Sequence, residues 1–152
     1  YPDSKTLVVA ISQSGETADT LEALRFAKKR GAKLLSLTNV NGSSIPRFSD
    51  EVIYLNAGPE IGVAATKTFT SQIAVIYKII FGGSIGKKIK DILISSYDAF
   101  EVIDRISEKI YKSTDVFFLG RGISYPIAME GALKLKELSY IHAEAYPGGE
   151  LK

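Results

Sequence analysis

Residues 7–17 read Leu7-Val8-Val9-Ala10-Ile11-Ser12-Gln13-Ser14-Gly15-Glu16-Thr17, an apolar run that stops at a cluster of hydroxyl side chains and one glycine. Beyond this stretch the apolar residues take helical spacing, at Leu21, Leu24 and Ala27. The pattern predicts a strand, a tight loop and a helix. In an α/β protein such a loop lies at the carboxyl edge of a sheet, where ligands bind.

The loop itself suits an anion. Ser12, Ser14 and Thr17 offer hydroxyl donors, and the helix that follows offers free backbone N–H groups. Gly15 lets the backbone approach a ligand closely. Because the loop lacks the G-K-[ST] ending of a Walker cradle, a small phosphate ester is the expected ligand. The alternative is that Thr17 only caps the helix and the two serines are ordinary turn residues.

The rest of the chain alternates between strand-like and helix-like patterns, which predicts an α/β fold with a mainly parallel sheet flanked by helices. The expected strands are residues 6–11, 33–38, 51–55, 115–119 and 143–146. The expected helices are residues 17–30, 64–81, 87–112 and 126–139, and the third of them is expected to be interrupted near residues 95–96. One further helical turn is expected near residues 45–49. The helix at 64–81 is apolar on more than one face, so it predicts burial against a sheet or a partner subunit.

The composition excludes several classes of protein and site. The 19 basic and 17 acidic residues leave a net charge of +2, too balanced for a nucleic-acid-binding protein. With no cysteine and one histidine, we expect no disulfide and no thiolate or histidine metal site. We expect no cofactor either. The longest apolar segment, 73–81, is too short to span a membrane, and residues 1–5 show no signal peptide. A cytoplasmic protein that does not bind membranes is therefore expected.

Three stretches together resemble the SIS (sugar isomerase) domains, and most closely the isomerase region of the glutamine–fructose-6-phosphate aminotransferase (glucosamine-6-phosphate synthase) family. They are Ser12-Gln13-Ser14-Gly15-Glu16-Thr17, Glu60-Ile61-Gly62-Val63-Ala64-Ala65-Thr66-Lys67 and the segment from Glu130-Gly131-Ala132-Leu133-Lys134 through Glu137 to Ala143-Glu144. The resemblance runs over nearly the whole chain. It implies a three-layer αβα SIS-type fold.

The order of the elements differs from that of one SIS domain in this family. Such a domain opens with a strand, a glycine-rich turn and a helix, and here that unit comes late, at 115–139. We therefore expect residues 1–82 to be the later part of a first SIS domain, 83–112 a helical connector and 113–152 the opening of a second. The late unit would complete a permuted single domain, or two chains would exchange these parts in a homodimer.

The resemblance implies an enzyme that makes glucosamine 6-phosphate from fructose 6-phosphate and ammonia, the ammonia coming from glutamine on a glutaminase domain. A proton must then move from C1 to C2 of the sugar, which needs a base. By resemblance that base is Glu137, and Lys134 positions it and the sugar oxygens. The alternative is a plain surface ion pair between the two. Ser12, Gln13, Ser14, Thr17 and the backbone at Val63 are the implied substrate-binding groups.

Four further residues have weaker assignments. Glu130, four residues before Lys134, is either an orienting partner or a helix-surface carboxylate. Arg121 is either a cation near a ligand at the sheet edge or an exposed loop residue. We expect His142 to be half-buried and structural, and Thr66 to cap the helix at 64–81.

In this family a ring-opening histidine follows the Gly-Glu-Leu-Lys segment with which the chain ends, and a Schiff-base lysine lies farther on. The resemblance therefore implies a fragment of the enzyme that does not complete the reaction alone. One rival interpretation is a non-catalytic SIS sugar-phosphate sensor, and another is a ketose/aldose phosphate isomerase that uses no ammonia. The Lys134 and Glu137 pair argues against the sensor, and the stretch 130–144 argues against the isomerase.

Overall fold

The computed structural model describes residues 1–83 and 85–150. The chain separates into two compact units. The first unit comprises residues 1–61 and 65–86, and the second comprises residues 62–64 and 87 onward.

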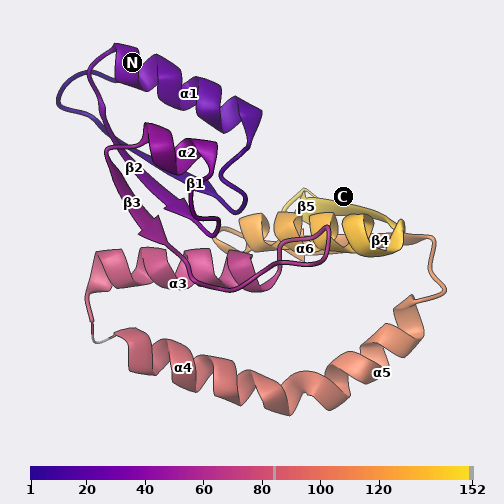
Figure 1. Ribbon diagram of the computed structural model, residues 1–152. Coiled ribbons are helices and arrows are strands. Elements are labelled where there is room, and N and C mark those ends of the chain that lie inside the picture. Colours follow the sequence, from indigo (N-terminus) through magenta and orange to yellow (C-terminus); the bar gives the residue numbers. More distant parts are fainter. Residues whose placement is uncertain (84, 151–152) are drawn as a thin grey trace. The chain divides into compact units, whose positions relative to one another are not determined.

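The first unit is built on a three-stranded parallel sheet in the order β1-β2-β3 (Figure 1). Register pairs Leu7 with Lys33 and Ser12 with Thr38, so the carboxyl ends of β1 and β2 are level. This parallel order confirms the prediction from the alternating pattern. The elements of this unit are β1 (Leu7–Ser12), α1 (Ala18–Lys29), β2 (Lys33–Thr38), α2 (Ser44–Phe48), β3 (Glu51–Tyr54) and α3 (Lys67–Phe81).

The core of the first unit lies between the sheet and helices α1 and α2. Leu24 and Ala27, on the predicted apolar face of α1, are 1% and 2% exposed. They cluster with Leu34 of β2 and Ile45 of α2. Burial of the larger side chains, Leu24, Leu34 and Ile45, stabilises the fold by roughly 1.5–3 kcal/mol each. This packing fixes the position of α1, and with it the loop that joins β1 to α1.

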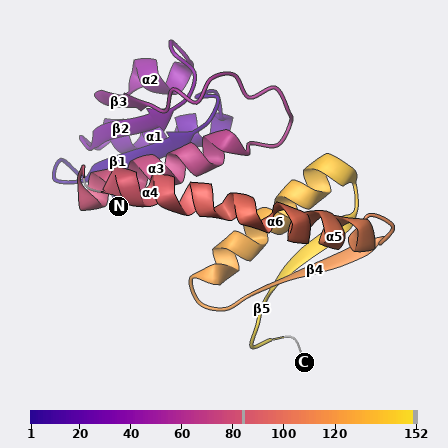
Figure 2. The ribbon, with the colours of Figure 1, turned by 90° about the horizontal axis from the view of Figure 1, so that it is seen from below.

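The second unit contains a two-stranded parallel sheet, and helix α6 packs against both of its strands (Figure 2). The expected interruption near residues 95–96 is confirmed as a short 3-10 turn between two helices. Its elements are α4 (Ile85–Ser95), which begins at the end of the first unit, then η1 (Ser96–Ala99), α5 (Phe100–Ile110), β4 (Asp115–Gly120), α6 (Ser124–Ser139) and β5 (His142–Pro147).

Helix α6 lies unusually close to β4 because glycines face the contact. A Cβ atom at Gly120 would lie 2.6 Å from the Cα atom of Tyr125. A Cβ atom at Gly131 would lie 3.0 Å from the ring of Phe118. The glycine after Glu130 therefore sets the depth at which α6 sits on the sheet, and with it the placement of the charged side chains on this helix.

The predicted fold class, parallel sheets flanked by helices, is confirmed, whereas one helix starts later than predicted. Helix α3 begins at Lys67 instead of residue 64. The preceding residues stay in the loop because the Glu60 carboxylate binds free N–H groups at the start of the helix. Within the described ranges, none of the helices combines the length and apolar character needed to cross a membrane.

Candidate functional site

The loop between β1 and α1 is held together by its own hydroxyl groups. The Ser12 and Thr17 hydroxyl oxygens lie 3.0 Å apart in a hydrogen bond, and the Gly15 N–H donates to Ser12 Oγ at 3.1 Å. The Glu16 N–H donates to Ser14 Oγ at 3.2 Å. Ser12 is buried, at 6% exposure, whereas Ser14 is half-buried and Thr17 exposed. Ser12 therefore shapes the loop, and Ser14 and Thr17 present their hydroxyls at its surface.

The interpretation that Thr17 merely caps helix α1 is wrong. Thr17 is the N-cap residue, but within the described chain its side chain makes no capping hydrogen bond. Its hydroxyl binds Ser12 instead. The N–H groups in the first turn of α1 are thus left for another acceptor, and the positive end of the helix dipole faces the same loop.

Gly15 is required by both its conformation and its surroundings. Its φ is +68°, in the left-handed region that favours glycine. A Cβ atom here would overlap the Ser43 hydroxyl and approach Thr38 Oγ1 to 3.0 Å. The sequence predicted a tight turn at this glycine, but not that the loop after β2 would fill the space beside it.

The loop after β2 and the start of helix α2 are bonded directly to the Ser12–Thr17 loop. The Asn39 N–H donates to the Gln13 carbonyl at 3.1 Å, and the Ile45 N–H donates to the Gly15 carbonyl at 2.9 Å. The Ser44 N–H donates to the Glu16 carboxylate at 2.8 Å. Ser44, through its hydroxyl and its backbone N–H, lowers the pKa of Glu16. These bonds fix the shape of the candidate phosphate loop before any ligand arrives.

A hollow of about 390 Å³ lies beside this loop, at the carboxyl edge of the sheet. Its lining comes from the loops after all three strands, which is where ligands bind in open α/β sheets. Asn39 holds the third of these loops: its amide donates to the Gly58 carbonyl at 2.7 Å and its side-chain oxygen accepts from the Ala57 N–H at 2.9 Å. The lining residues are Gln13, Asn39, Val40, Asn41, Gly58, Pro59 and Glu60. Of these, only Gln13 was expected from the sequence to bind substrate.

Glu60 makes four hydrogen bonds to the start of helix α3. Its carboxylate accepts from the N–H and hydroxyl of Thr68, at 3.1 and 2.6 Å, and from the N–H and hydroxyl of Thr66, at 3.3 and 3.2 Å. Thr66 is the N-cap residue, as predicted, but its hydroxyl donates to Glu60 instead of capping the helix. In the sequence, the only indication of these hydrogen bonds is the position of Glu60, six residues before Thr66 and eight before Thr68.

The same bonds affect the charge of Glu60. The hydrogen bonds from Thr68, and then those from Thr66, hold the pKa of Glu60 below its ordinary value of 4.5. Because the folded pKa is depressed, the stability that these bonds contribute is present above pH 4.5. It is lost as the pH falls through the folded value.

The second unit carries a separate cluster of charged residues on one face of α6. Lys134 Nζ lies 2.8 Å from the Glu137 carboxylate and 3.2 Å from that of Glu130. The three side chains are only 21–29% exposed. The prediction that Lys134 and Glu137 share a face is confirmed, and Glu130 joins them. Both pairs are half-buried, and one cation serves two carboxylates.

The charge of Lys134 is maintained against partial burial. Burial disfavours the ammonium, but the hydrogen bonds to Glu137 and Glu130 outweigh it and raise the pKa of Lys134 above its ordinary 10.5. The stability contributed by this charge is therefore fully present below pH 10.5 and is lost as the pH rises through the folded value. At neutral pH the cluster holds one cation between two carboxylates.

Replacing Lys134 by Met is expected to lower the free energy of unfolding by about 1–2 kcal/mol at pH 7.5, the scale of charged hydrogen bonds at half-buried positions. Two carboxylates would then face each other on one helix. Urea unfolding at pH 7.5 measures this loss. Lys136→Met is the control, because Lys136 pairs with Glu144 at a more exposed place, and it should cost less than about 0.5 kcal/mol.

The other candidate residues belong to neither of these clusters. Val63 is 89% exposed in the loop between β3 and α3. Arg121 is exposed in the turn after β4. The expectation that His142 is half-buried is wrong: it begins β5, its side chain is 59% exposed, and its Nδ1 lies 2.9 Å from the Asp115 carboxylate. Asp115 and His142 are paired at the first position of β4 and β5, and both side chains are exposed.

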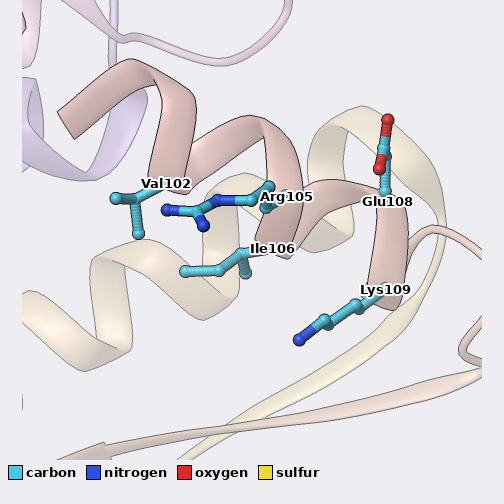
Figure 3. Close-up of a pocket in the computed structure, with 5 residues that line it drawn as sticks. All are labelled: Val102, Arg105, Ile106, Glu108 and Lys109. Atoms are coloured by element: carbon cyan, nitrogen blue, oxygen red, sulfur yellow. The ribbon is translucent and has the colours of Figure 1, made fainter.

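A second hollow, of about 410 Å³, follows helix α5 and is drawn in Figure 3. All the residues that line it come from this one helix, and Glu108 points away from the apolar side chains. A ligand site normally needs polar groups that converge from several elements. The hollow at the carboxyl edge of β1–β3 meets that condition and this one does not. No group of three metal-ligating side chains occurs among residues 1–83 and 85–150.

Comparison with known proteins finds one domain family and a consistent set of relatives. The SIS domain family matches residues 2–81 and 109–152. Glutamine–fructose-6-phosphate aminotransferase (isomerizing) from Mycolicibacterium smegmatis is 50% identical over 99% of this chain, which is 26% of that protein. The same enzyme from Caldanaerobacter subterraneus is 46% identical over 99% of the chain and 27% of that protein. The chain thus spans about a quarter of the length of these relatives.

Solved structures of related proteins agree with the family match. The C-terminal domain of glucosamine-fructose-6-phosphate aminotransferase from Francisella tularensis is similar with a TM-score of 0.83 and 46% identity, covering 95% of this chain and 46% of that one. Glucosamine-6-phosphate deaminase from Thermotoga maritima is similar with a TM-score of 0.81 and 26% identity, covering 95% of this chain and 46% of that one.

Proposed function

The chain belongs to the SIS domain family, and from this we propose that it binds a sugar phosphate and forms part of an enzyme that makes glucosamine 6-phosphate from fructose 6-phosphate and ammonia. The observation that carries the proposal is the Ser12–Thr17 loop, which joins hydroxyl donors, a left-handed glycine and an uncapped helix N-terminus at the carboxyl edge of a parallel sheet. These are the groups that a phosphate monoester requires. The names of the relatives supply the substrate.

Within the loop the roles divide according to exposure. Ser14 and Thr17 would donate their hydroxyls to phosphate oxygens, and the first N–H groups of α1 would add to them. Ser12 would hold the loop in shape from its buried position. Gln13 borders the hollow, where the sugar would lie. The contact of the Val63 backbone with the sugar hydroxyls rests on the family resemblance alone.

The proton transfer would be performed by Glu137. Lys134 binds its Oε2 atom, which leaves Oε1 to take the proton from C1 of the sugar and return it to C2. Lys134 would hold the Glu137 carboxylate in place, and Glu130 would orient Lys134 from the other side. The C1 proton, once removed, leaves an enol-like intermediate that a cation stabilises.

Calorimetric titration with fructose 6-phosphate tests the loop. We expect saturable binding of fructose 6-phosphate and glucosamine 6-phosphate, and little binding of unphosphorylated fructose. Ser14→Ala should weaken binding by about 1 kcal/mol or more, the scale of one hydrogen bond to a charged group. The control is Ser4→Ala, which removes a hydroxyl from an exposed serine beside Gly31, near the start of β1.

Equal binding of fructose with and without its phosphate would contradict the proposal, as would a Ser14→Ala chain that binds as tightly as the wild type. Absence of heat at millimolar sugar phosphate would mean that this chain does not bind sugar phosphates by itself. Thermal unfolding of both variants verifies that they remain folded.

The assembly of the whole enzyme is also proposed. Residues 1–82 would be the later part of one SIS domain, 83–112 a connector and 113–152 the opening of another, which fits a family match in two separate stretches. A glutaminase domain would supply ammonia, and the protein would act in the cytoplasm as a homodimer. The exposed apolar end of α3, Tyr77, Ile79, Ile80 and Phe81, supports a subunit contact.

A further inference from the structure

Two helices of the first unit begin near the hollow, and their N-termini differ in charge. Helix α1 begins at Ala18 with no side-chain cap from Thr17. Helix α3 begins at Lys67, and the carboxylate of Glu60 accepts hydrogen bonds at its first turn. Each N-terminus carries the equivalent of about half a positive charge. The N-terminus of α1 has Asp19 in its first turn but no capping hydrogen bond from Thr17, whereas the N-terminus of α3 is closed by the Glu60 carboxylate, which accepts hydrogen bonds there.

Glu60 stands where it can affect a ligand in the hollow. It lines the hollow together with Gln13 of the candidate phosphate loop. The Lys67 ammonium lies close to Gly58 on the same loop, so the start of α3 would attract anions strongly without the carboxylate. The bonds from Thr66 and Thr68 keep Glu60 charged at neutral pH.

We infer that Glu60 is a positioning residue that determines where the phosphate group binds: it closes the N-terminus of α3 and directs the phosphate to the Ser12–Thr17 loop. This inference rests on the proposed function. It goes beyond it by giving a role to a residue that need not touch the substrate. A phosphate placed at α3 would put the sugar in the wrong part of the hollow.

The carboxylate also fixes the loop that borders the hollow. Asn39 holds this loop at Ala57 and Gly58, and Glu60 holds it at the start of α3. Only Pro59 lies between Gly58 and Glu60. A purely structural role would be met by any side chain that keeps these hydrogen bonds, whereas the directing role requires the negative charge.

The test uses backbone amide spectra of the isotope-labelled chain titrated at pH 7.5 with inorganic phosphate and with fructose 6-phosphate. In the wild type, the ligands should change the chemical shifts of the backbone amides of residues 14–20 and leave those of residues 66–68 unchanged. In Glu60→Gln, which has the same size without the charge, inorganic phosphate should shift the amides of Thr66, Lys67 and Thr68. The affinity for fructose 6-phosphate should fall by about twofold to fivefold, the effect of one charge at a helix terminus.

Two further variants separate charge from structure. Glu60→Asp keeps the charge with a shorter reach and should keep phosphate away from 66–68. Glu51→Gln removes the same charge from an exposed position on β3 and should behave like the wild type. Circular dichroism checks that all variants are folded.

The outcomes are distinguishable. If inorganic phosphate leaves residues 66–68 unshifted in Glu60→Gln, or shifts them in the wild type, the inference is overturned. If fructose 6-phosphate does not shift residues 14–20 in the wild type, the proposed function fails. The response of residues 66–68 to inorganic phosphate still decides the role of Glu60 in that case.

Discussion

A Gly15→Ala chain is expected to lose about 2–5 kcal/mol of unfolding free energy relative to the wild type, and to lose sugar-phosphate binding with it. Two costs add at this position. The φ of +68° costs an L-residue about 1–2 kcal/mol, and forcing a methyl group into a filled space costs about 1–3 kcal/mol. The new Cβ atom would overlap the Ser43 hydroxyl, so the loops after β1 and β2 would have to separate. Urea unfolding gives the free energy, and calorimetry gives the binding.

Gly42→Ala is the matched control. Gly42 has nearly the same conformation, with φ of +71°, but nothing lies within 4 Å of the position where its Cβ atom would be. Its substitution should cost about 1–2 kcal/mol, the conformational part alone. An equal loss in the two variants would show that the packing of Gly15 against Ser43 contributes nothing to stability, and would contradict the role of close packing between the two loops.

Glu137→Gln is expected to lower turnover about 10²- to 10⁴-fold, the usual contribution of a positioned general base. The assay uses the chain completed on the pattern of its full-length relatives, of which it spans about a quarter. Gln has the size of Glu but cannot take the C1 proton. Lys134 would keep one partner, Glu130, so the helix should remain folded. Fructose 6-phosphate binding should stay within about twofold, because the phosphate would be bound by the Ser12–Thr17 loop.

This substitution also separates an enzyme from a sensor. A sensor that only binds sugar phosphate needs no base, so its response to ligand would be the same in Glu137→Gln and in the wild type. Glu108→Gln, an exposed carboxylate on α5, is the control and should leave turnover unchanged. Unchanged turnover in Glu137→Gln would remove Glu137 from the mechanism.

The features that depend on local spacing could be predicted from the sequence alone. An apolar run that ends at Ser12 predicted the strand and the loop at its carboxyl end. A helical period predicted that Glu130, Lys134 and Glu137 would share a face, because residues three and four apart in a helix are neighbours in any helical chain. The strand at 33–38 was predicted to the residue, because its apolar run is bounded by turn-forming residues on both sides.

The tertiary fold determined which residues from different loops contact each other. Ser12 is buried and shapes the loop, Gly15 faces Ser43 from the next loop, and Asn39 binds Gly58. Glu60 reaches Thr66 and Thr68 through a loop that has no periodicity of its own. Contacts of this kind depend on where parallel strands bring their loops, and no regular spacing along the chain records them. The sequence therefore predicted which residues the candidate phosphate loop contains, and the fold determined which of them hold its shape and which expose their hydroxyl groups.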